Sequence, residues 1–378
     1  MIYLNNAASS WPKAPGVADA VRQSLERPPC DVGRGGVVEG DPVNKCRELM
    51  GHLLGVADAS RIVFTLNATA ALNLAIQGAP LRSGDVIVTS VAEHNSVLRP
   101  AEKLRLERGI EVEIVGLAPD GSLDEDWFRR ALARRPRLVV LTHASNVTGR
   151  VFPIERLFRG AKNAGALTVL DASQSLGLIP VSPEPMNADI VVFTGHKGLL
   201  GPSGVGGLYV GPAIDLEQIL VGGTGVRSDL KEHPREMPGR LEAGTHNLAG
   251  LAGLAAAVEW LKSDGHHIAT VARRRGDSLR RELARIPGVE IFDQDGDCER
   301  VGVVSFRISG WDVGEAGTVL NQSFEIACRA GLHCAPLIHP RIGSSPAGTL
   351  RFSASGFTTE NEVGAASDAV RRLAKCAS

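Results

Sequence analysis

An aspartate and a lysine stand where two short apolar runs of the sequence end. Residues 167–170 lead into Asp171, and residues 190–193 lead into Lys197. In an open parallel sheet, ligands bind beyond the carboxyl ends of the strands, so we expect both side chains at that edge. Pyridoxal 5′-phosphate (PLP) needs a lysine for its Schiff base and an acid that keeps its pyridine nitrogen protonated. Singly, Asp171 could be a helix N-cap and Lys197 a surface charge; together they favour a PLP site.

A phosphate site is expected where the run at residues 62–64 gives way to a helix. There the backbone N–H groups around Ala68 and the hydroxyl of Thr69 could hold the cofactor phosphate at a helix N-terminus. A threonine near an ordinary helix cap is an equally good reading of Thr69 alone. The glycine-rich segment 201–207 resembles neither a P-loop nor a GxGxxG motif, which argues against ATP and NAD.

Alternating apolar runs and helical patterns predict the scaffold that positions these residues. Helical periodicity between the runs indicates an α/β fold, with a largely parallel sheet covered on both faces. We expect strands at residues 62–64, 86–88, 112–115, 138–141, 167–170, 190–193 and 207–210. We expect helices at residues 68–76, 97–108, 123–134, 154–164, 248–261 and 273–285, followed by strands at 301–308 and 349–353.

Length and composition limit the class of protein. The 378 residues allow two domains, and we assign residues 14–261 to a large PLP-binding domain and residues 1–13 with 262–378 to a smaller α+β domain. The formal charge of -1 favours a small-molecule partner over nucleic acid or a membrane. The N-terminus lacks signal-peptide character and no apolar stretch is long enough to span a bilayer, so we expect a cytoplasmic protein. Six cysteines without a CxxC pair disfavour disulfides and a metal site, and most are expected to be buried.

Eight short motifs along the chain resemble those of the class V aminotransferase-fold PLP enzymes, within them the cysteine desulfurase and selenocysteine lyase family. The resemblance runs from Tyr3 to Val363 and implies fold-type I, with a mostly parallel seven-stranded sheet. The motifs occupy residues 3–8, 92–95, 145–149, 171–174, 194–197, 242–245, 329–334 and 350–353.

The resemblance also implies a role for each matching residue. His94 would stack on the PLP ring, Asp171 would pair with its nitrogen and Gln174 would bond its phenolic oxygen. The phosphate would be held by Thr69, Thr194 and His196, with Thr245 reaching the phosphate of the other subunit in a homodimer. Asn146 and Arg351 would bind the substrate carboxylate, and Lys197 and Cys334 would be catalytic together with His94.

Cys334 decides which reaction the sequence predicts. A buried structural thiol is the commonest fate of a cysteine, and we assign it to Cys298, Cys328 and Cys376. Cys334 lies in a glycine- and proline-punctuated segment beside His333, which favours an exposed, activatable thiolate. That segment resembles the SUF-type desulfurases, whereas the ending at residues 351–360 is closer to the ISC type. The charged stretch 227–238 matches no motif.

The sequence therefore predicts a PLP-dependent cysteine desulfurase. It would convert L-cysteine to L-alanine, leave the sulfur on Cys334 as a persulfide, and pass it to an acceptor protein. A selenocysteine lyase or another β-lyase acting on a cysteine analogue would use the same residues. A non-catalytic PLP-fold scaffold in a sulfur-transfer complex is the alternative from another class.

Overall fold

A mostly parallel sheet forms the centre of the larger part of the molecule. The computed structural model describes residues 1–28, 41–225, 229–292 and 298–376, and within them the sheet has seven strands in the order β2-β8-β7-β6-β5-β3-β4. Only β8 runs antiparallel to its neighbours. The strands are β2 (Ile62–Thr65), β3 (Val86–Ser90), β4 (Glu111–Val115), β5 (Leu138–Thr142), β6 (Leu167–Asp171), β7 (Ile190–Thr194) and β8 (Gly206–Val210). All seven predicted strands are confirmed.

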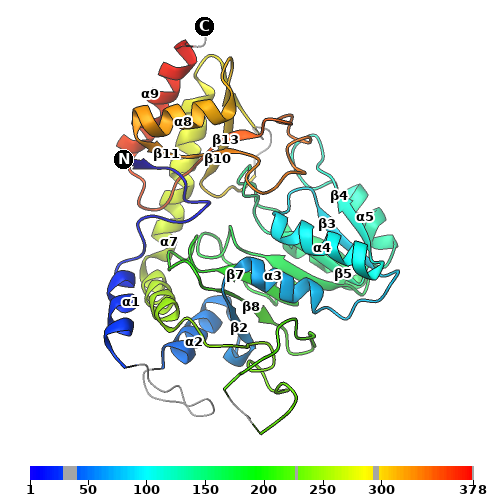
Figure 1. Ribbon diagram of the computed structural model, residues 1–378. Helices are drawn as coiled ribbons and strands as arrows, with labels where there is room; N and C mark the ends of the chain where they lie inside the picture. The colour runs from blue at the N-terminus through cyan, green and yellow to red at the C-terminus, as the bar shows by residue number, and fades with distance from the viewer. Residues whose placement is uncertain (29–40, 226–228, 293–297, 377–378) are drawn as a thin grey trace.

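Helices bury both faces of this sheet. Along β5, Leu138 and Val140 join one apolar cluster, whereas Val139 and Leu141 join another. A strand buried on both faces needs no alternating polar residues, which explains the continuous apolar runs of the sequence. In Figure 1, α3 and α4 lie together over one face. The covering helices are α3 (Ala68–Gln77) and α4 (Asn95–Arg108) on that face, and α2 (Pro42–Leu54), α5 (Glu125–Ala133), α6 (Ile154–Asn163) and the start of α7 (Leu248–Ala284) on the other.

One helix replaces the two that the sequence predicts at residues 248–261 and 273–285. Helix α7 runs unbroken for 37 residues and connects the two parts of the molecule (Figure 1). A glycine inside a helix costs only about 1 kcal/mol relative to alanine, so Gly265 does not end α7 when α1, α2 and α9 pack along it. The domain boundary predicted after residue 261 falls inside this helix, and the division into two domains stays a prediction.

The smaller part of the molecule combines the end of the chain with its beginning. Strand β1 (Ile2–Tyr3) runs parallel to β11 (Ile326–Ala327), and the N-terminus lies beside α8 and α9 in Figure 1. An antiparallel sheet lies next to them in the order β12-β13-β10-β9. Its elements are β9 (Val289–Ile291), β10 (Val303–Ile308), β12 (Arg329–Gly331) and β13 (Thr349–Ser353); the remaining helices are α1 (Val17–Glu26), η1 (Ala59–Arg61), α8 (Val313–Phe324) and α9 (Glu360–Cys376).

The cysteines other than Cys334 differ in their exposure. Cys46 is buried, and Cys298 and Cys328 are half-buried. The prediction of a buried thiol is wrong for Cys376, which is exposed because it lies at the end of α9, beyond the last buried residue of that helix. Cys30 lies outside the described residues.

Two further features concern the surface. Residues 227 and 228 of the charged stretch 227–238 lie outside the described part of the chain, and most of residues 229–238 form an exposed loop. Within the described ranges, the helices are all too short or too polar to cross a membrane.

Candidate active site

A cavity of about 230 Å³ opens at the carboxyl ends of β5, β6 and β7. These strands are parallel neighbours, so the residues that follow them converge at one edge of the sheet. The structure brings most of the predicted site residues together here. Those that line the cavity are Ala68, Thr69, His94, Asn146, Asp171, Gln174, Thr194, His196 and Lys197.

Lys197 faces this cavity from the turn after β7. Burial is the main reason that the pKa of its amine is lowered to about 8. The positive charges of Arg351 and Arg329 lower it further, whereas the negative charge of Asp171 raises it. A larger share of the amine is therefore unprotonated near neutral pH than in an exposed lysine, and the unprotonated amine is the nucleophile that an aldehyde needs.

Asp171, the last residue of β6, is buried at the cavity wall. Its Oδ1 atom accepts a hydrogen bond from the backbone N–H of Ser173 at 2.9 Å, which fixes the carboxylate. Gln174 Nε2 donates to the carbonyl of Ala7 at 2.9 Å and so orients the amide beside it. A fixed carboxylate that lines the same cavity as Lys197 fits the pyridine nitrogen of PLP.

His94 caps α4, which begins at the next residue. Its Nδ1 atom accepts from the backbone N–H of Ser96 at 3.1 Å and from the Ser96 hydroxyl at 2.7 Å. Burial, together with the Lys197 charge, lowers the pKa of His94 to about 4. The ring is therefore neutral with its proton on Nε2, which suits a flat ring that stacks on a cofactor.

One end of the cavity has the properties of a phosphate site. Helix α3 starts there, and Asn67 caps it by accepting from the N–H of Ala70 at 3.0 Å, while the first N–H groups of a helix lack intrahelical partners. The hydroxyl of Thr194, which pairs with Gly206 of β8 at this corner, is buried without a hydrogen-bond partner among the described residues. A Cβ atom at Gly206 would lie 2.7 Å from the backbone of Asn67, so glycine lets β8 approach this corner. These groups fit a bound phosphate.

Cys334 lies near the cavity on the segment that follows β12. Its sulfur accepts a hydrogen bond from Arg329 Nη2 at 3.0 Å, and Arg329 lines the cavity. His333 and Cys334 have φ angles of 51° and 60°, in the left-handed region that side-chain-bearing residues seldom adopt. Asn146 Nδ2 donates to the His333 carbonyl at 2.7 Å, and the Asn95 N–H donates to the Cys334 carbonyl at 2.7 Å. Neighbours of the cavity therefore hold the strained turn that presents the thiol.

Arg351 does not line the cavity. Its side chain is fully buried, with Nη1 donating to the Asn146 carbonyl at 2.8 Å and Nη2 donating to Asn5 Oδ1 at 3.3 Å. Burial, with the nearby Arg329 charge, lowers the pKa of Arg351 to about 9. Of the two residues predicted to bind the substrate carboxylate, only Asn146 lines the cavity; Arg351 is hydrogen-bonded to the Asn146 carbonyl behind it.

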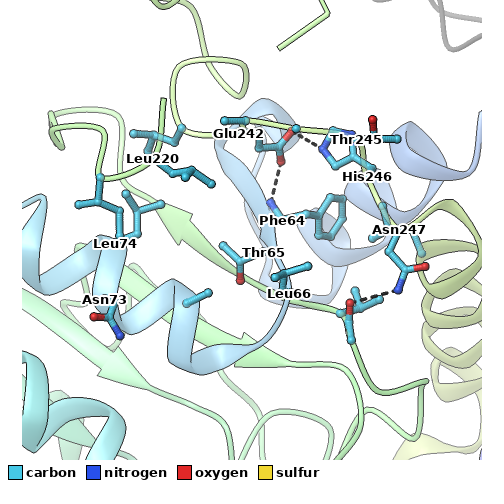
Figure 2. Close-up of a pocket in the computed structure, with 18 residues that line it drawn as sticks. Phe64, Thr65, Leu66, Asn73, Leu74, Leu220, Glu242, Thr245, His246 and Asn247 are labelled. Atoms are coloured by element: carbon cyan, nitrogen blue, oxygen red, sulfur yellow. Dashed lines mark hydrogen bonds and ion pairs between the residues drawn. The ribbon is translucent and has the colours of Figure 1, made fainter. Parts of the chain in front are cut away.

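Thr245 lies away from Lys197, on the wall of a second cavity of about 200 Å³. Figure 2 shows it beside His246 and Glu242, and it is exposed. The two cavities share the corner between β2 and α3: Leu66 and Ala70 line one, and residues 67–69 line the other. Thr245 is thus exposed and lies outside the cavity that Lys197 lines.

Sequence reasoning missed five polar residues at or near the cavity. Ser96, Thr142, Ser173 and Arg329 line it, and Glu93 is buried where its Oε1 atom accepts from the N–H of Thr142 at 3.0 Å. A signal existed for Thr142, which ends an apolar run as Asp171 does, and for Arg329, which opens the motif that ends in Cys334.

Comparison with known proteins identifies the family. The sequence model of the aminotransferase class-V family matches residues 2–365. The chain belongs to this family. A probable cysteine desulfurase of Methanothermobacter thermautotrophicus is 32% identical over 373 residues, covering 96% of this chain and 92% of the relative. The cysteine desulfurase CsdA of Escherichia coli is 32% identical over 384 residues, covering 98% and 93%.

Solved structures of class-V relatives share the whole architecture. The apo cysteine desulfurase of Thermococcus onnurineus superposes with a TM-score of 0.89 at 29% identity, over 99% of this chain and 95% of the other. CsdA of Escherichia coli gives a TM-score of 0.87 at 28% identity, over 99% and 95%. The predicted α/β fold of the PLP fold-type I enzymes is confirmed.

Proposed function

We propose that this class-V enzyme is a PLP-dependent cysteine desulfurase that converts L-cysteine to L-alanine and keeps the sulfur on Cys334. One observation carries the proposal: Arg329 lines the cavity that holds Lys197 and Asp171 and also donates to the sulfur of Cys334. The relatives named cysteine desulfurases, which match nearly the full chain, support the same reading.

Lys197 would hold the cofactor covalently, with Asp171 at the ring nitrogen and His94 on the ring face. The phosphate would lie at the N-terminus of α3, where Thr69 and Thr194 reach it. PLP supplies an electron sink that makes the substrate α-proton acidic.

Proton transfer and sulfur transfer belong to two different residues. Lys197 would take the α-proton of the substrate on Nζ. The Cys334 thiolate attacks the substrate sulfur, so that a sulfur–sulfur bond forms as the carbon–sulfur bond breaks. The bonding electrons stay with the substrate β-carbon, which takes up a proton; the α-carbon regains the proton held on Lys197, and alanine leaves. Atoms balance, because one cysteine and one enzyme thiol give one alanine and one persulfide.

Cofactor attachment is tested by borohydride reduction of the purified yellow protein. Peptide mass analysis should find the pyridoxyl group on the Lys197 peptide. A label on Lys162, which is paired with Asp189 at the surface, would overturn the assignment. So would a protein that stays colourless after PLP is added.

Product analysis separates the desulfurase from a lyase. With L-cysteine we expect alanine and enzyme-bound sulfur in equal amounts; pyruvate with ammonia, or turnover of L-selenocysteine alone, would favour a different β-lyase or a selenocysteine lyase. No turnover of either substrate by PLP-loaded protein would indicate a non-catalytic scaffold.

The partners proposed are L-cysteine, a second copy of the chain and a sulfur-acceptor protein. The position of Thr245 outside its own cavity supports a homodimer in which each chain completes the phosphate site of the other. Light scattering of the PLP-loaded protein should give twice the mass of the chain, and a fully active monomer would refute this part of the proposal.

A further inference from the structure

A buried ion pair anchors the segment that carries Thr245. The side chains of Arg47 and Glu242 are each 7% exposed. Arg47 donates to both carboxylate oxygens of Glu242, at 2.8 and 3.0 Å, and also to the carbonyl of Ile62. Its guanidinium lies 4.8 Å from the ring centre of Phe64. A two-point contact of this kind fixes orientation as well as distance, so Glu242 is locked against α2 and β2.

The same carboxylate ties together the two sides of the segment. The N–H of Phe64 donates to Glu242 Oε1 at 2.6 Å, and His246 Nε2 lies 2.9 Å from Oε2, as the dashed lines of Figure 2 show. Burial raises the pKa of Glu242, but the bond from His246 and the Arg47 charge more than offset it, so the pKa lies below its ordinary value. Glu242 is therefore ionised, and its bond to His246 fixes the two ends of the segment 243–245 relative to each other.

The anchored turn presents Thr245 outward. Gly244 has a φ of +90°, which glycine adopts without strain, and Thr245 follows it on the exposed side. The surroundings are apolar and accessible: Leu66 is 67% and Leu220 is 66% exposed, and both line the cavity shared with Thr245. Large exposed apolar side chains around a fixed polar group are typical of a protein interface.

We propose that Arg47, acting through Glu242, is a positioning residue for Thr245 and hence for the cofactor phosphate of the partner subunit. This inference rests on the proposed PLP-binding homodimer. A change at Arg47 should therefore weaken the cofactor site of the partner chain and leave the cofactor site of its own chain unaffected. A purely structural role would damage the chain that carries the change.

Mixed dimers of two differently tagged chains test this expectation. In the first, one chain carries Arg47→Lys and the other carries Lys197→Ala. The single remaining Lys197 then belongs to the chain with Arg47→Lys, but the phosphate of its PLP meets Thr245 of the partner, in which Arg47 is intact. We therefore expect cofactor retention equal to that of a wild-type/Lys197→Ala dimer. In the second, one chain carries both changes and its partner is wild type. Its Lys197 meets the displaced Thr245, and PLP loss should be about ten-fold faster, as for one lost hydrogen bond to a charged group.

Retention is measured by the decay of cofactor absorbance on dilution and by the yield of reduced pyridoxyl-Lys197 peptide. Thr245→Ala in place of Arg47→Lys should reproduce both patterns. Pyridoxal, which has no phosphate, should dissociate at the same rate from both mixed dimers. The opposite pattern, equal retention in both dimers, or faster loss from both would overturn the inference.

Two safeguards keep the test decisive. If Arg47→Lys fails to fold, Glu242→Gln replaces it, since it keeps the size and one acceptor oxygen of the side chain but removes the charge that Arg47 pairs with. The wild-type homodimer is tested first, and if it holds no cofactor on Lys197, the proposed function itself fails. If the wild type binds PLP normally but a change at Arg47 speeds PLP loss only from the chain that carries it, the role of Arg47 alone is rejected.

Discussion

Arg329 Nη2 lies 3.0 Å from the sulfur of Cys334, while Arg329 lines the cavity of Lys197. One guanidinium thus contacts the thiol and borders the space where the substrate would lie. Because the thiolate is the nucleophilic form of cysteine, a fixed cation at hydrogen-bond distance favours reaction.

Replacing Arg329 should therefore slow the chemistry of Cys334. We expect Arg329→Met to lower the rate of Cys334 alkylation by iodoacetamide at neutral pH several-fold, and alanine formation with it. Arg329→Lys is the matched control, which keeps the charge but loses the planar guanidinium, and should give an intermediate rate. Cofactor absorbance should be unchanged in both variants; equal alkylation rates in all three proteins would contradict the role.

The amine of Lys197 should capture PLP with a pH dependence set by its lowered pKa. Below about pH 8 the amine is protonated and unreactive, and above that value it is free. In cofactor-free protein, the rate of covalent PLP capture should rise about ten-fold per pH unit below pH 8 and level off above it. Stopped-flow absorbance with borohydride trapping measures this rate.

Another lysine provides the control for that titration. Burial also lowers the pKa of Lys13 to about 8, but its amine bonds to Ser10 and to the His196 carbonyl. Peptide mass analysis of the trapped protein should place the label on Lys197 and not on Lys13. A capture rate that still increases at pH 10 would show that burial does not set the reactivity of Lys197.

Glu93 should act as a neutral hydrogen-bonded acid beneath the cavity. Burial, with a smaller contribution from Asp171, raises its pKa to about 8, against the bonds from Ser90 at 2.6 Å and Thr142 at 3.0 Å. Glu93→Gln keeps an acceptor for both donors, so unfolding in urea near pH 6 should change by less than about 1 kcal/mol. Glu93→Leu leaves both donors buried without an acceptor and should cost about 1–3 kcal/mol for each.

The pH dependence of protein stability tests whether Glu93 is protonated in the folded state. A folded-state pKa above the ordinary value of 4.5 means that the folded protein binds the proton more tightly than the unfolded chain. Wild-type stability from this group is therefore lost as the pH rises from 4.5 to about 8, by up to roughly 1.4 kcal/mol per unit. Glu93→Gln should gain on wild type between pH 6 and pH 8; parallel stability curves would contradict it.

The sequence predicts the sheet and the cofactor end of the site because both depend on local patterns. Most strands, although not the edge strand β4, are buried apolar runs. Asp171 and Lys197 come at or shortly after the ends of two such runs, so their meeting follows from parallel topology. The continuity of α7 could not be read this way, since Gly265 is tolerated only because distant helices pack along the chain.

Contacts between residues far apart in the sequence escaped prediction for the same reason. Arg47 and Glu242 are separated by 195 positions, and nothing local marks them as partners. The burial of Arg351 behind Asn146 likewise depends on how the smaller part of the molecule packs on the larger sheet. Residue types and spacing predict site residues that lie at the end of a single strand. They do not predict contacts between two segments that are far apart in the sequence.

Cys334 provides the test that separates the desulfurase from a lyase. Cys334→Ala should keep the cofactor, because the predicted cofactor contacts do not involve this side chain, and cysteine should still bind through Asn146. Alanine formation from L-cysteine should fall roughly 100-fold or more, because the lost group acts in carbon–sulfur cleavage and not in binding. With L-selenocysteine the loss should be milder, since a selenol leaves more readily than a thiol. Cys328→Ala, a half-buried thiol six positions earlier, is the matched control and should leave both activities intact. Turnover of cysteine by Cys334→Ala at the wild-type rate would reject sulfur transfer to Cys334, even if Lys197 does hold PLP.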